Sequence, residues 1–295
     1  GALVVDVARP DDKKELPPCI VRKHDGAALY ATSDLATLIE REKDYHPGHV
    51  IYVVDKRQEL HFTQVFRVAK MTGIVGEDTP LTFIGFGTMN GTDGKPFKTR
   101  DGGVMRLEML ISDVSEKVYE KILENRDISE EEAREISKII GLAAIKYGDL
   151  SNQATKDYVF DIDRFTSFEG NTGPYILYTI VRIKSILKKY AEQGNELSAN
   201  GKIVDFGSES ERSLKLVLTQ FNDVMEASYN ELAPHRVCAY IYEVANAFNR
   251  FYHENNIMNE ENADKQKSYI NLLTLTKKVL EQCIDLLAID APERM

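Results

Sequence analysis

The sequence lacks several features of membrane proteins, metal-binding proteins and exported proteins. It has no apolar run of about 18 residues, which a membrane-spanning helix would need. Its three cysteines, Cys19, Cys238 and Cys283, lie far apart, and none belongs to a C-x-x-C or Cys/His cluster that could bind zinc. The start, GALVVDVARPDD, lacks the charged-then-apolar layout of a signal peptide. We therefore expect a cytoplasmic protein with reduced thiols.

The chain also lacks an excess of positive charge. Its 37 Lys and Arg residues are outnumbered by 47 Asp and Glu residues, which gives a net charge of −10 over 295 residues. This charge excludes a wholly basic protein that coats nucleic acid, but it allows a local basic face. The length suits two domains, and the apolar fraction of 43 % is enough for sizeable cores.

The first part of the sequence alternates short β-type runs with helical periodicity. Strands are predicted at residues 3–7, 19–23, 50–54 and 81–86, and helices at residues 32–42 and 61–71. Such alternation is typical of a parallel α/β sheet. The run VIYVV at residues 50–54 is apolar throughout, so we expect a strand that is buried on both faces.

From residue 108 onward, apolar residues recur almost everywhere at a spacing of three to four, which predicts helices. The helical segments are residues 108–125, 129–147, 174–191, 207–230, 233–255 and 262–288. Ser129 precedes three glutamates and is placed to cap its helix, and Pro174 and Pro234 stand where a helix should begin. The predicted fold class is therefore α/β followed by an all-α helix bundle.

The stretch His46-Pro47-Gly48-His49 has nearly the letters of H-I-G-H, the signature with which one class of ligases binds ATP. In that signature the histidines follow a strand and open a helix, whose N-terminus binds phosphate. Here the order is reversed, because a predicted helix precedes these residues and a strand follows them. We therefore interpret Pro47-Gly48 as a turn and not as a nucleotide site.

Five other stretches are more specific, because they occur in one chain and in a fixed order. They are DGAALYATSDLA (residues 25–36), DKRQELHF (55–62), DGKPFKTR (93–100), FEGNTGPY (168–175) and APERM (291–295). Together they resemble arginyl-tRNA synthetase over the whole chain. The resemblance implies the second half of a Rossmann-type class I synthetase catalytic domain in residues 1–164, with a K-M-S-K-S-like loop and connecting helices. It implies a helical anticodon-binding domain in residues 165–295.

A Tyr/Asp pair lies where a predicted strand is followed by a helix. Tyr30 and Asp34 are four residues apart, so both side chains lie on one face of the helix start. A carboxylate matches the N–H donors of a guanidinium, and the resemblance implies that both residues bind the arginine side chain. It also implies that Gln58, after the strand at residues 50–54, contacts the backbone part of arginine. From the residues alone, Asp34 as a helix N-cap and Tyr30 as a core aromatic stay open.

The resemblance implies that the Gly-rich loop at residues 85–103 corresponds to the K-M-S-K-S loop of class I synthetases, although FKTR replaces those letters. Arginine activation needs cations near the ATP triphosphate, where negative charge grows as pyrophosphate leaves. The candidate catalytic residues are Lys98, Lys95 and Arg100. The resemblance implies that His61, Gly87 and Lys98 contact ATP. A solvent-exposed charged hairpin, and a helix-end role for His61, are the alternatives.

The predicted helix at residues 174–191 carries two stripes. Its apolar stripe should pack inward and consists of Ile176, Ile180, Ile183 and Leu187. Its second stripe is Tyr175, Tyr178 and Arg182, in a segment (174–190) with four basic residues and no acidic one. Tyrosines beside an arginine can stack on unpaired bases and hold phosphates. The resemblance implies that this stripe, with Tyr252 and Met295, reads the tRNA anticodon; a half-buried aromatic face is the alternative.

The resemblance implies an arginine–tRNA ligase that uses ATP with Mg²⁺, L-arginine and tRNA(Arg), without a tightly bound metal or organic cofactor. The family's own H-I-G-H motif would lie upstream of Gly1, and nothing in this sequence matches it. We therefore expect a C-terminal fragment that is inactive alone. We expect the full-length enzyme to be monomeric and the fragment to self-associate through an uncovered sheet. A stand-alone, non-catalytic tRNA-binding module is the alternative.

Overall fold

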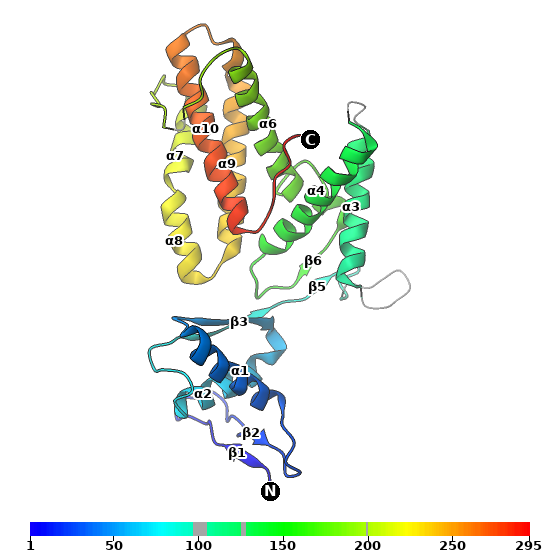
Figure 1. Cartoon of the computed structure of the whole chain (residues 1–295), viewed down its shortest axis with the longest axis vertical. Coiled ribbons are helices and arrows are strands. Elements are labelled where there is room, and N and C mark those ends of the chain that lie inside the picture. The colour runs from blue at the N-terminus through cyan, green and yellow to red at the C-terminus, as the bar shows by residue number, and fades with distance from the viewer. Residues whose placement is uncertain (97–104, 125–127, 199) are drawn as a thin grey trace. The chain divides into compact units, whose positions relative to one another are not determined.

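The chain forms two compact units (Figure 1). The structure, a computed structural model, describes residues 1–96, 105–124, 128–198 and 200–295. The first unit contains Gly1–Thr88 and Ala154–Asp157, and the second contains Met89–Gln153 and Tyr158–Met295. Within the described ranges, no helix is long and apolar enough to cross a membrane. The predicted domain boundary after residue 164 stays a prediction.

The first unit contains two separate pairs of strands. Its elements are β1 (Leu3–Val5), β2 (Cys19–Arg22), α1 (Tyr30–Tyr45), β3 (Val50–Asp55), the 3-10 helix η1 (Lys56–Gln58), α2 (Glu59–Met71) and β4 (Leu81–Phe86). β3 and β4 pair in parallel, as predicted, with Val50 opposite Leu81. β1 and β2 pair antiparallel, so the prediction of one parallel sheet is wrong for them. The segment that joins them contains no helix, whereas parallel neighbours need a crossover connection.

The core of the first unit lies between α1, α2 and one face of β3. Val50 and Tyr52 of β3 are buried in one cluster with residues of both helices, such as Val65. Ile51 and Val53 are 41 % and 60 % exposed, because successive side chains of a strand point to opposite faces. The prediction that this strand is buried on both faces is therefore wrong for the described chain, which covers one face.

The HPGH stretch is a turn from a helix into a strand, as predicted. α1 ends at Tyr45, and His46 closes it in a left-handed backbone conformation with a φ of 45°. The chain then enters β3, and His49 Nε2 lies 2.7 Å from the Thr82 hydroxyl on β4. These histidines therefore serve the turn and the sheet edge.

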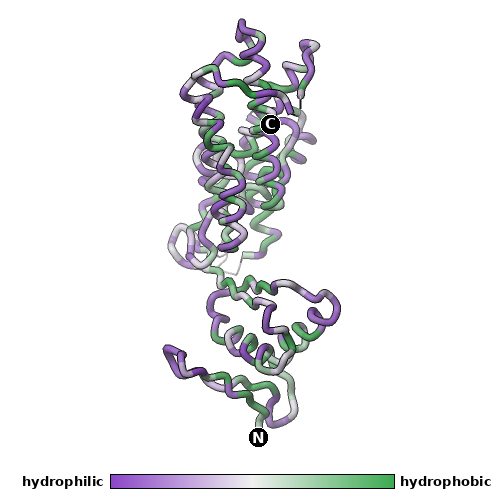
Figure 2. Tube along the Cα trace, turned by 90° about the vertical axis from the view of Figure 1, so that its left-hand side faces the viewer, coloured by the Kyte–Doolittle hydropathy of each residue, from purple (hydrophilic) through white to green (hydrophobic). Residues whose placement is uncertain are grey.

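The second unit is mainly helical, as predicted. Its elements are β5 (Met89–Asn90), α3 (Leu107–Leu123), α4 (Glu130–Leu150), β6 (Tyr158–Val159), α5 (Ile162–Phe165), α6 (Gly173–Glu192), α7 (Glu209–Thr219), α8 (Phe221–Glu231), α9 (Pro234–Glu254), η2 (Ile257–Asn259) and α10 (Ala263–Leu286). Hydrophilic and hydrophobic residues alternate along these helices (Figure 2). This alternation is expected for helices that bury one side.

The predicted helix at residues 207–230 is in fact two helices, α7 and α8, so that prediction is wrong. The chain breaks at Gln220, whose N–H donates to the Val217 carbonyl at 3.1 Å and tightens the last turn of α7. The Phe221 ring then packs beside Tyr240 of α9, with ring centroids 6.3 Å apart. The break allows both short helices to pack against α9.

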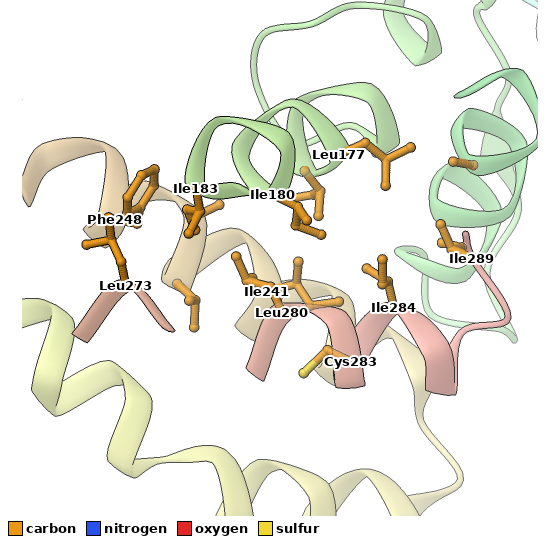
Figure 3. Packing of buried hydrophobic residues seen from close by; sticks show 14 of the residues in the cluster. Leu177, Ile180, Ile183, Ile241, Phe248, Leu273, Leu280, Cys283, Ile284 and Ile289 are labelled. Carbon is orange, nitrogen blue, oxygen red and sulfur yellow. The ribbon is translucent and has the colours of Figure 1, made fainter. Parts of the chain in front are cut away.

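The facing sides of α6, α9 and α10 build much of the core of the second unit (Figure 3). Side chains from all three helices point toward one another, among them Ile180, Ile241 and Ile284. The predicted apolar stripe of α6 is confirmed, because all four members are buried: Ile176, Ile180, Ile183 and Leu187.

All three cysteines are free and buried. Cys19 lies in β2 of the first unit, whereas Cys238 lies in α9 and Cys283 in α10 of the second. Burial raises the pKa of the Cys238 and Cys283 thiols to about 12, so both stay protonated at neutral pH.

The start of α6 is fixed by its cap and by close packing. Thr172 is the N-cap, and its hydroxyl accepts a hydrogen bond from Tyr175 N at 3.3 Å. Pro174 occupies the first turn, as predicted. Gly173 packs so closely against α4 that an added Cβ would lie 2.5 Å from the Ala143 carbonyl oxygen. The tyrosine stripe of α6 starts directly after this anchored turn.

Candidate functional site

In the first unit, the structure brings Asp34 of α1 and His61 of α2 together. His61 Nε2 lies 2.6 Å from Asp34 Oδ2, and the two side chains are 27 % and 29 % exposed. The N-cap of α1 is Leu29, so the alternative of Asp34 as an N-cap is wrong. Asp34 is thus a partly exposed carboxylate that is hydrogen-bonded to the His61 ring nitrogen.

In the sequence, Tyr30 lies shortly before Asp34 and Gln58 lies shortly before His61. Tyr30 opens α1 one turn before Asp34 and is 85 % exposed, so the alternative of a core aromatic is wrong. Gln58 ends η1 immediately before α2 and is also exposed. Neither side chain hydrogen-bonds to another residue in the part of the chain that the structure describes. Both are therefore available to a ligand, and their binding of arginine stays a prediction.

The loop after β4 contains the predicted cations of the ATP site. Lys95 is exposed, and its side chain forms no ion pair with a described residue. Its N–H donates to Asp93 Oδ1 at 3.0 Å, and its carbonyl accepts from Gly91 N at 2.7 Å. The other two candidates, Lys98 and Arg100, lie outside the described residues.

Gly87 has a packing role. An added Cβ would lie 2.4 Å from the backbone of Lys156, and the Gly87 N–H donates to the Ala154 carbonyl at 2.9 Å. The neighbouring Asp157 accepts from Lys56 Nζ at 2.7 Å, and this hydrogen bond lowers the pKa of the Asp157 carboxyl. A contact between Gly87 and ATP stays a prediction.

In the second unit, α6 and α9 place aromatic side chains around Arg182. We call Tyr175, Tyr178, Arg182 and Tyr252 the tyrosine–arginine patch. The guanidinium carbon of Arg182 lies 4.6 Å from the ring centroid of Tyr178 and 5.2 Å from that of Tyr252. Its Nη2 also donates to the Tyr178 hydroxyl at 3.1 Å. Tyr178 and Tyr252 are exposed, so the patch presents aromatic rings and one positive charge.

Two asparagines of α9, which no motif singled out, hold this patch in place. Asn249 Oδ1 accepts from Arg182 Nη1 at 2.7 Å, and Asn249 Nδ2 donates to the Tyr175 hydroxyl at 2.8 Å. The Tyr175 hydroxyl in turn donates to Asn246 Oδ1 at 2.8 Å. The available signal in the sequence was two amide side chains three residues apart, on one side of an amphipathic helix.

Tyr175 differs from the other tyrosines of the patch because it is half-buried. Its ring meets Tyr242 edge-on, with centroids 5.8 Å apart. Burial raises the pKa of the Tyr175 phenol, so its proton remains available for Asn246. The alternative of a half-buried aromatic face describes Tyr175, whereas Tyr178 and Tyr252 are 39 % and 36 % exposed.

The last residues of the chain are attached to α6 and α4 by ion pairs. Lys184 Nζ of α6 lies 2.7 Å from Glu293 Oε1, and Arg294 forms an ion pair with Glu132 of α4. Met295 packs against the helical core and is partly buried. Its part in reading an anticodon stays a prediction.

The described residues contain no group of three or more His, Cys, Asp or Glu side chains that could hold a metal ion. A cavity of about 300 Å³ adjoins the start of α6 and is lined in part by Arg164, Asn171 and Gly173. Asn171 accepts a hydrogen bond from the buried Tyr147 hydroxyl at 2.6 Å, which fixes the loop before α6.

Two family models match the chain. The one described as "tRNA synthetases class I (R), catalytic domain" matches residues 1–162. The one described as "DALR anticodon binding domain" matches residues 176–295. Between them they match all of the chain except residues 163–175.

Similar proteins cover the whole chain. The arginine–tRNA ligase of Agathobacter rectalis is 59 % identical over 302 residues, across 100 % of this chain and 51 % of that protein. The arginine–tRNA ligase of Alkaliphilus oremlandii is 60 % identical over 295 residues, across 100 % of this chain and 50 % of that protein. The chain therefore spans about half the length of the curated relatives it matches.

Solved structures show the same fold. The crystal structure of arginyl-tRNA synthetase from Plasmodium falciparum has a TM-score of 0.81 and 26 % identity, covering 100 % of this chain and 49 % of that one. The Thermus thermophilus arginyl-tRNA synthetase also reaches 0.81, at 22 % identity. The predicted fold class is confirmed: part of a class I synthetase catalytic domain is followed by an all-helical anticodon-binding domain. The chain belongs to the arginyl-tRNA synthetase family.

Proposed function

We propose that this chain supplies part of an arginine–tRNA ligase, which activates L-arginine with ATP and transfers it to tRNA(Arg). The observation that carries the proposal is the tyrosine–arginine patch, which lies within and just before the residues matched by the anticodon-binding model. Exposed aromatic rings stack on unpaired bases, and a guanidinium pairs with phosphate. The proposed domains are catalytic for residues 1–164 and anticodon-binding for residues 165–295, and Met295 is proposed as a further member of the anticodon site.

We propose that the Asp34 carboxylate binds the guanidinium of the substrate. Its two oxygens match two N–H donors, and the side chain is accessible. Tyr30 would lie against the substrate side chain, and Gln58 would hydrogen-bond to its backbone groups. His61, the proposed ATP contact, occupies one acceptor site of Asp34 Oδ2, and the remaining acceptor sites of the carboxylate are open to the guanidinium.

The proposed reaction begins when an oxygen of the arginine carboxylate attacks the α-phosphorus of ATP. The bond to the bridging oxygen breaks, and pyrophosphate leaves with the electron pair. Lys95, together with Lys98 and Arg100, would neutralise the leaving charge, Gly87 would contact ATP, and Mg²⁺ would arrive with the ATP phosphates. A hydroxyl at the tRNA end then attacks the arginyl carbonyl carbon, and AMP leaves.

The chain spans about half the length of its relatives, so we propose that it neither activates arginine nor charges tRNA alone. We further propose that the complete enzyme is a cytoplasmic monomer, and that this chain self-associates through the exposed side of β3. The paired and accessible Asp34 disfavours a non-catalytic tRNA-binding module, because such a module has no use for an arginine clamp.

The first test is binding of labelled tRNA(Arg) to the chain at two salt concentrations, with a tRNA of substituted anticodon as the control RNA. Tyr178→Ala should weaken binding of the matched tRNA about 5- to 150-fold, because base stacking on an aromatic ring contributes about 1–3 kcal/mol. Tyr229→Ala is the matched control, since Tyr229 is a 77 % exposed tyrosine on α8. Higher salt should weaken binding by both native chain and control variant.

Binding that depends on the anticodon and is lost selectively in Tyr178→Ala would support the proposal. Binding that ignores the anticodon, or equal losses in the two tyrosine variants, would contradict the assignment of the patch.

A further inference from the structure

The tyrosine–arginine patch is held by a row of hydrogen bonds whose donors can all be identified. A guanidinium can only donate, so Arg182 Nη1 makes Asn249 Oδ1 the acceptor of their 2.7 Å bond. The Asn249 amide nitrogen must then face the Tyr175 hydroxyl at 2.8 Å and Thr179 Oγ1 at 3.3 Å. The charge of Arg182 thereby fixes the orientation of the Asn249 amide.

The same direction continues beyond Asn249. The Tyr175 hydroxyl accepts from Asn249 and therefore gives its own proton to Asn246 Oδ1, at 2.8 Å. The Thr179 hydroxyl gives its proton to the Tyr175 carbonyl oxygen at 3.0 Å, which leaves its oxygen free to accept. Both hydroxyl protons of this row are thus used inside the protein.

The hydroxyl of Tyr178 is different. Its oxygen accepts from Arg182 Nη2 at 3.1 Å, and no described residue accepts its proton. The residue is 39 % exposed, so this proton is available to a bound molecule. A ligand atom that meets it has to be an acceptor, such as a carbonyl oxygen or a ring nitrogen of an unpaired base.

We infer that Asn249 is a positioning residue of the proposed anticodon site, and that the base group bound at Tyr178 is a hydrogen-bond acceptor. This inference rests on the proposed function, because it concerns the same patch. Asn249 is half-buried and acts through Arg182, which it holds 4.6 Å from the Tyr178 ring centroid and 5.2 Å from that of Tyr252. The held guanidinium in turn commits the Tyr178 oxygen as an acceptor and leaves its proton for the ligand.

The chain offers a matched control for this role. Asn246 lies one turn earlier on α9 and carries the same amide, but it joins the row only through Tyr175. It has no hydrogen bond to Arg182 among the described residues. A merely structural need for amides on this side of α9 would make the two asparagines equivalent, whereas a positioning role separates them.

The experiment compares Asn249→Ala, Asn249→Asp and Asn246→Ala in the full chain. The readout is the ratio of the Kd for a tRNA of substituted anticodon to the Kd for tRNA(Arg). Asn249→Ala should lower this ratio about 10-fold, because Arg182 loses the acceptor that places it. Asn249→Asp keeps that acceptor and should keep the ratio within about 2-fold, even though its added charge weakens binding of every tRNA. Asn246→Ala should lower the ratio less than Asn249→Ala does, because Asn246 contacts Tyr175 and not Arg182.

A second set of variants tests the acceptor. Tyr178→Phe keeps the ring and removes the hydroxyl, so tRNA(Arg) should bind about 3- to 10-fold more weakly. Anticodon-loop RNAs with one abasic position each then locate the partner, since its removal should weaken binding by the native chain more than binding by Tyr178→Phe, which keeps only the stacking on the ring. The double variant Asn249→Ala/Tyr178→Phe should be less impaired than the product of the single effects, because both act on one contact.

The outcomes separate this inference from the proposed function. If the native chain discriminates anticodons and a folded Asn249→Ala keeps the full ratio, Asn249 is not a positioning residue and the inference fails alone. If Asn249→Ala does not fold, loss of the ratio in a folded Asn249→Asp, or undiminished binding by Tyr178→Phe, overturns the inference. If the native chain does not discriminate anticodons, the proposed function fails as well.

Discussion

Among single residues, Asp12 and Arg67 give the first unit a dependence on pH. Arg67 Nη1 donates to Asp12 Oδ2 at 2.7 Å and Nη2 donates to Oδ1 at 2.5 Å. These hydrogen bonds lower the pKa of Asp12 from 3.8 to about 2. Because the folded pKa lies below the unfolded one, the pair stabilises the fold fully above about pH 4, and this contribution is lost as the pH falls toward 2.

Asp12→Asn should therefore lower the melting temperature at neutral pH, and the difference from the native chain should shrink between about pH 4 and pH 2. Thermal unfolding followed by circular dichroism measures this. Asp78→Asn is the control, because Asp78 is exposed and its side chain pairs with no described residue. A difference that stays constant down to pH 2 would contradict the assignment of the pH effect to Asp12.

The functional role of a residue could be predicted where the residue belongs to a sequence motif. It could not be predicted where the role depends on a contact between helices that are distant in the sequence. Asp34 was singled out because the stretch DGAALYATSDLA resembles a motif of the family, but only the observed helix start at Tyr30 excludes the N-cap alternative. Asn249 was missed because its role depends on Arg182, which lies 67 residues away in the sequence. Neither helix alone contains a signal for that hydrogen bond.

Among elements, the contact between α6 and α4 sets where the tyrosine–arginine patch begins. Gly173→Ala would place a methyl group 2.5 Å from the Ala143 carbonyl oxygen, a backbone atom that cannot move aside cheaply. Such overpacking costs typically about 1–3 kcal/mol. We expect the free energy of unfolding of the second unit to fall by that amount.

Chemical denaturation, followed by helix signal, measures this cost, and Ser185→Ala is the control on the exposed side of the same helix. Since α6 carries Tyr178 and Arg182, the folded fraction of Gly173→Ala should also bind tRNA(Arg) more weakly. Unchanged stability in Gly173→Ala would show that α6 and α4 can separate without cost.

The positions of helices and strands could be predicted from the spacing of apolar residues where a single spacing runs through one element. β4 was predicted at residues 81–86 and is observed at Leu81–Phe86. The break between α7 and α8 was missed, because the apolar spacing continues across Gln220 and the tight turn depends on packing against α9. The antiparallel pairing of β1 with β2 was missed for a similar reason, since strand direction is decided by the connection and not by the strand residues.

For the whole molecule, the share of the relatives that the chain spans leads to a prediction about activity. The residues proposed to surround ATP and arginine lie in one half of a family protein, and activation needs preorganised groups on all sides of the triphosphate. The chain alone should show no arginine-dependent ATP–pyrophosphate exchange above its rate without arginine. A full-length arginine–tRNA ligase is the positive control. Exchange that needs arginine and disappears in Asp34→Asn would refute this prediction.

The two-part plan of the molecule could be read from the sequence because each half has its own period, alternating strands and helices first and helices only afterwards. The net charge of −10 gave no hint of an RNA site, because the patch relies on one arginine and three tyrosines and not on a large excess of positive charge. The sequence also does not predict what packs against the exposed side of β3, because the residues of a strand do not identify the element or partner that contacts them.

The three native cysteines can report the order in which the two units unfold. One thiol lies in the first unit and two lie in the second, and all three are buried. An alkylating reagent present during gradual denaturation would add one mass increment to a chain whose first unit alone has opened, and two to a chain whose second unit alone has opened. Mass spectrometry of the alkylated native sequence can therefore assign each unfolding step to its unit without an introduced cysteine.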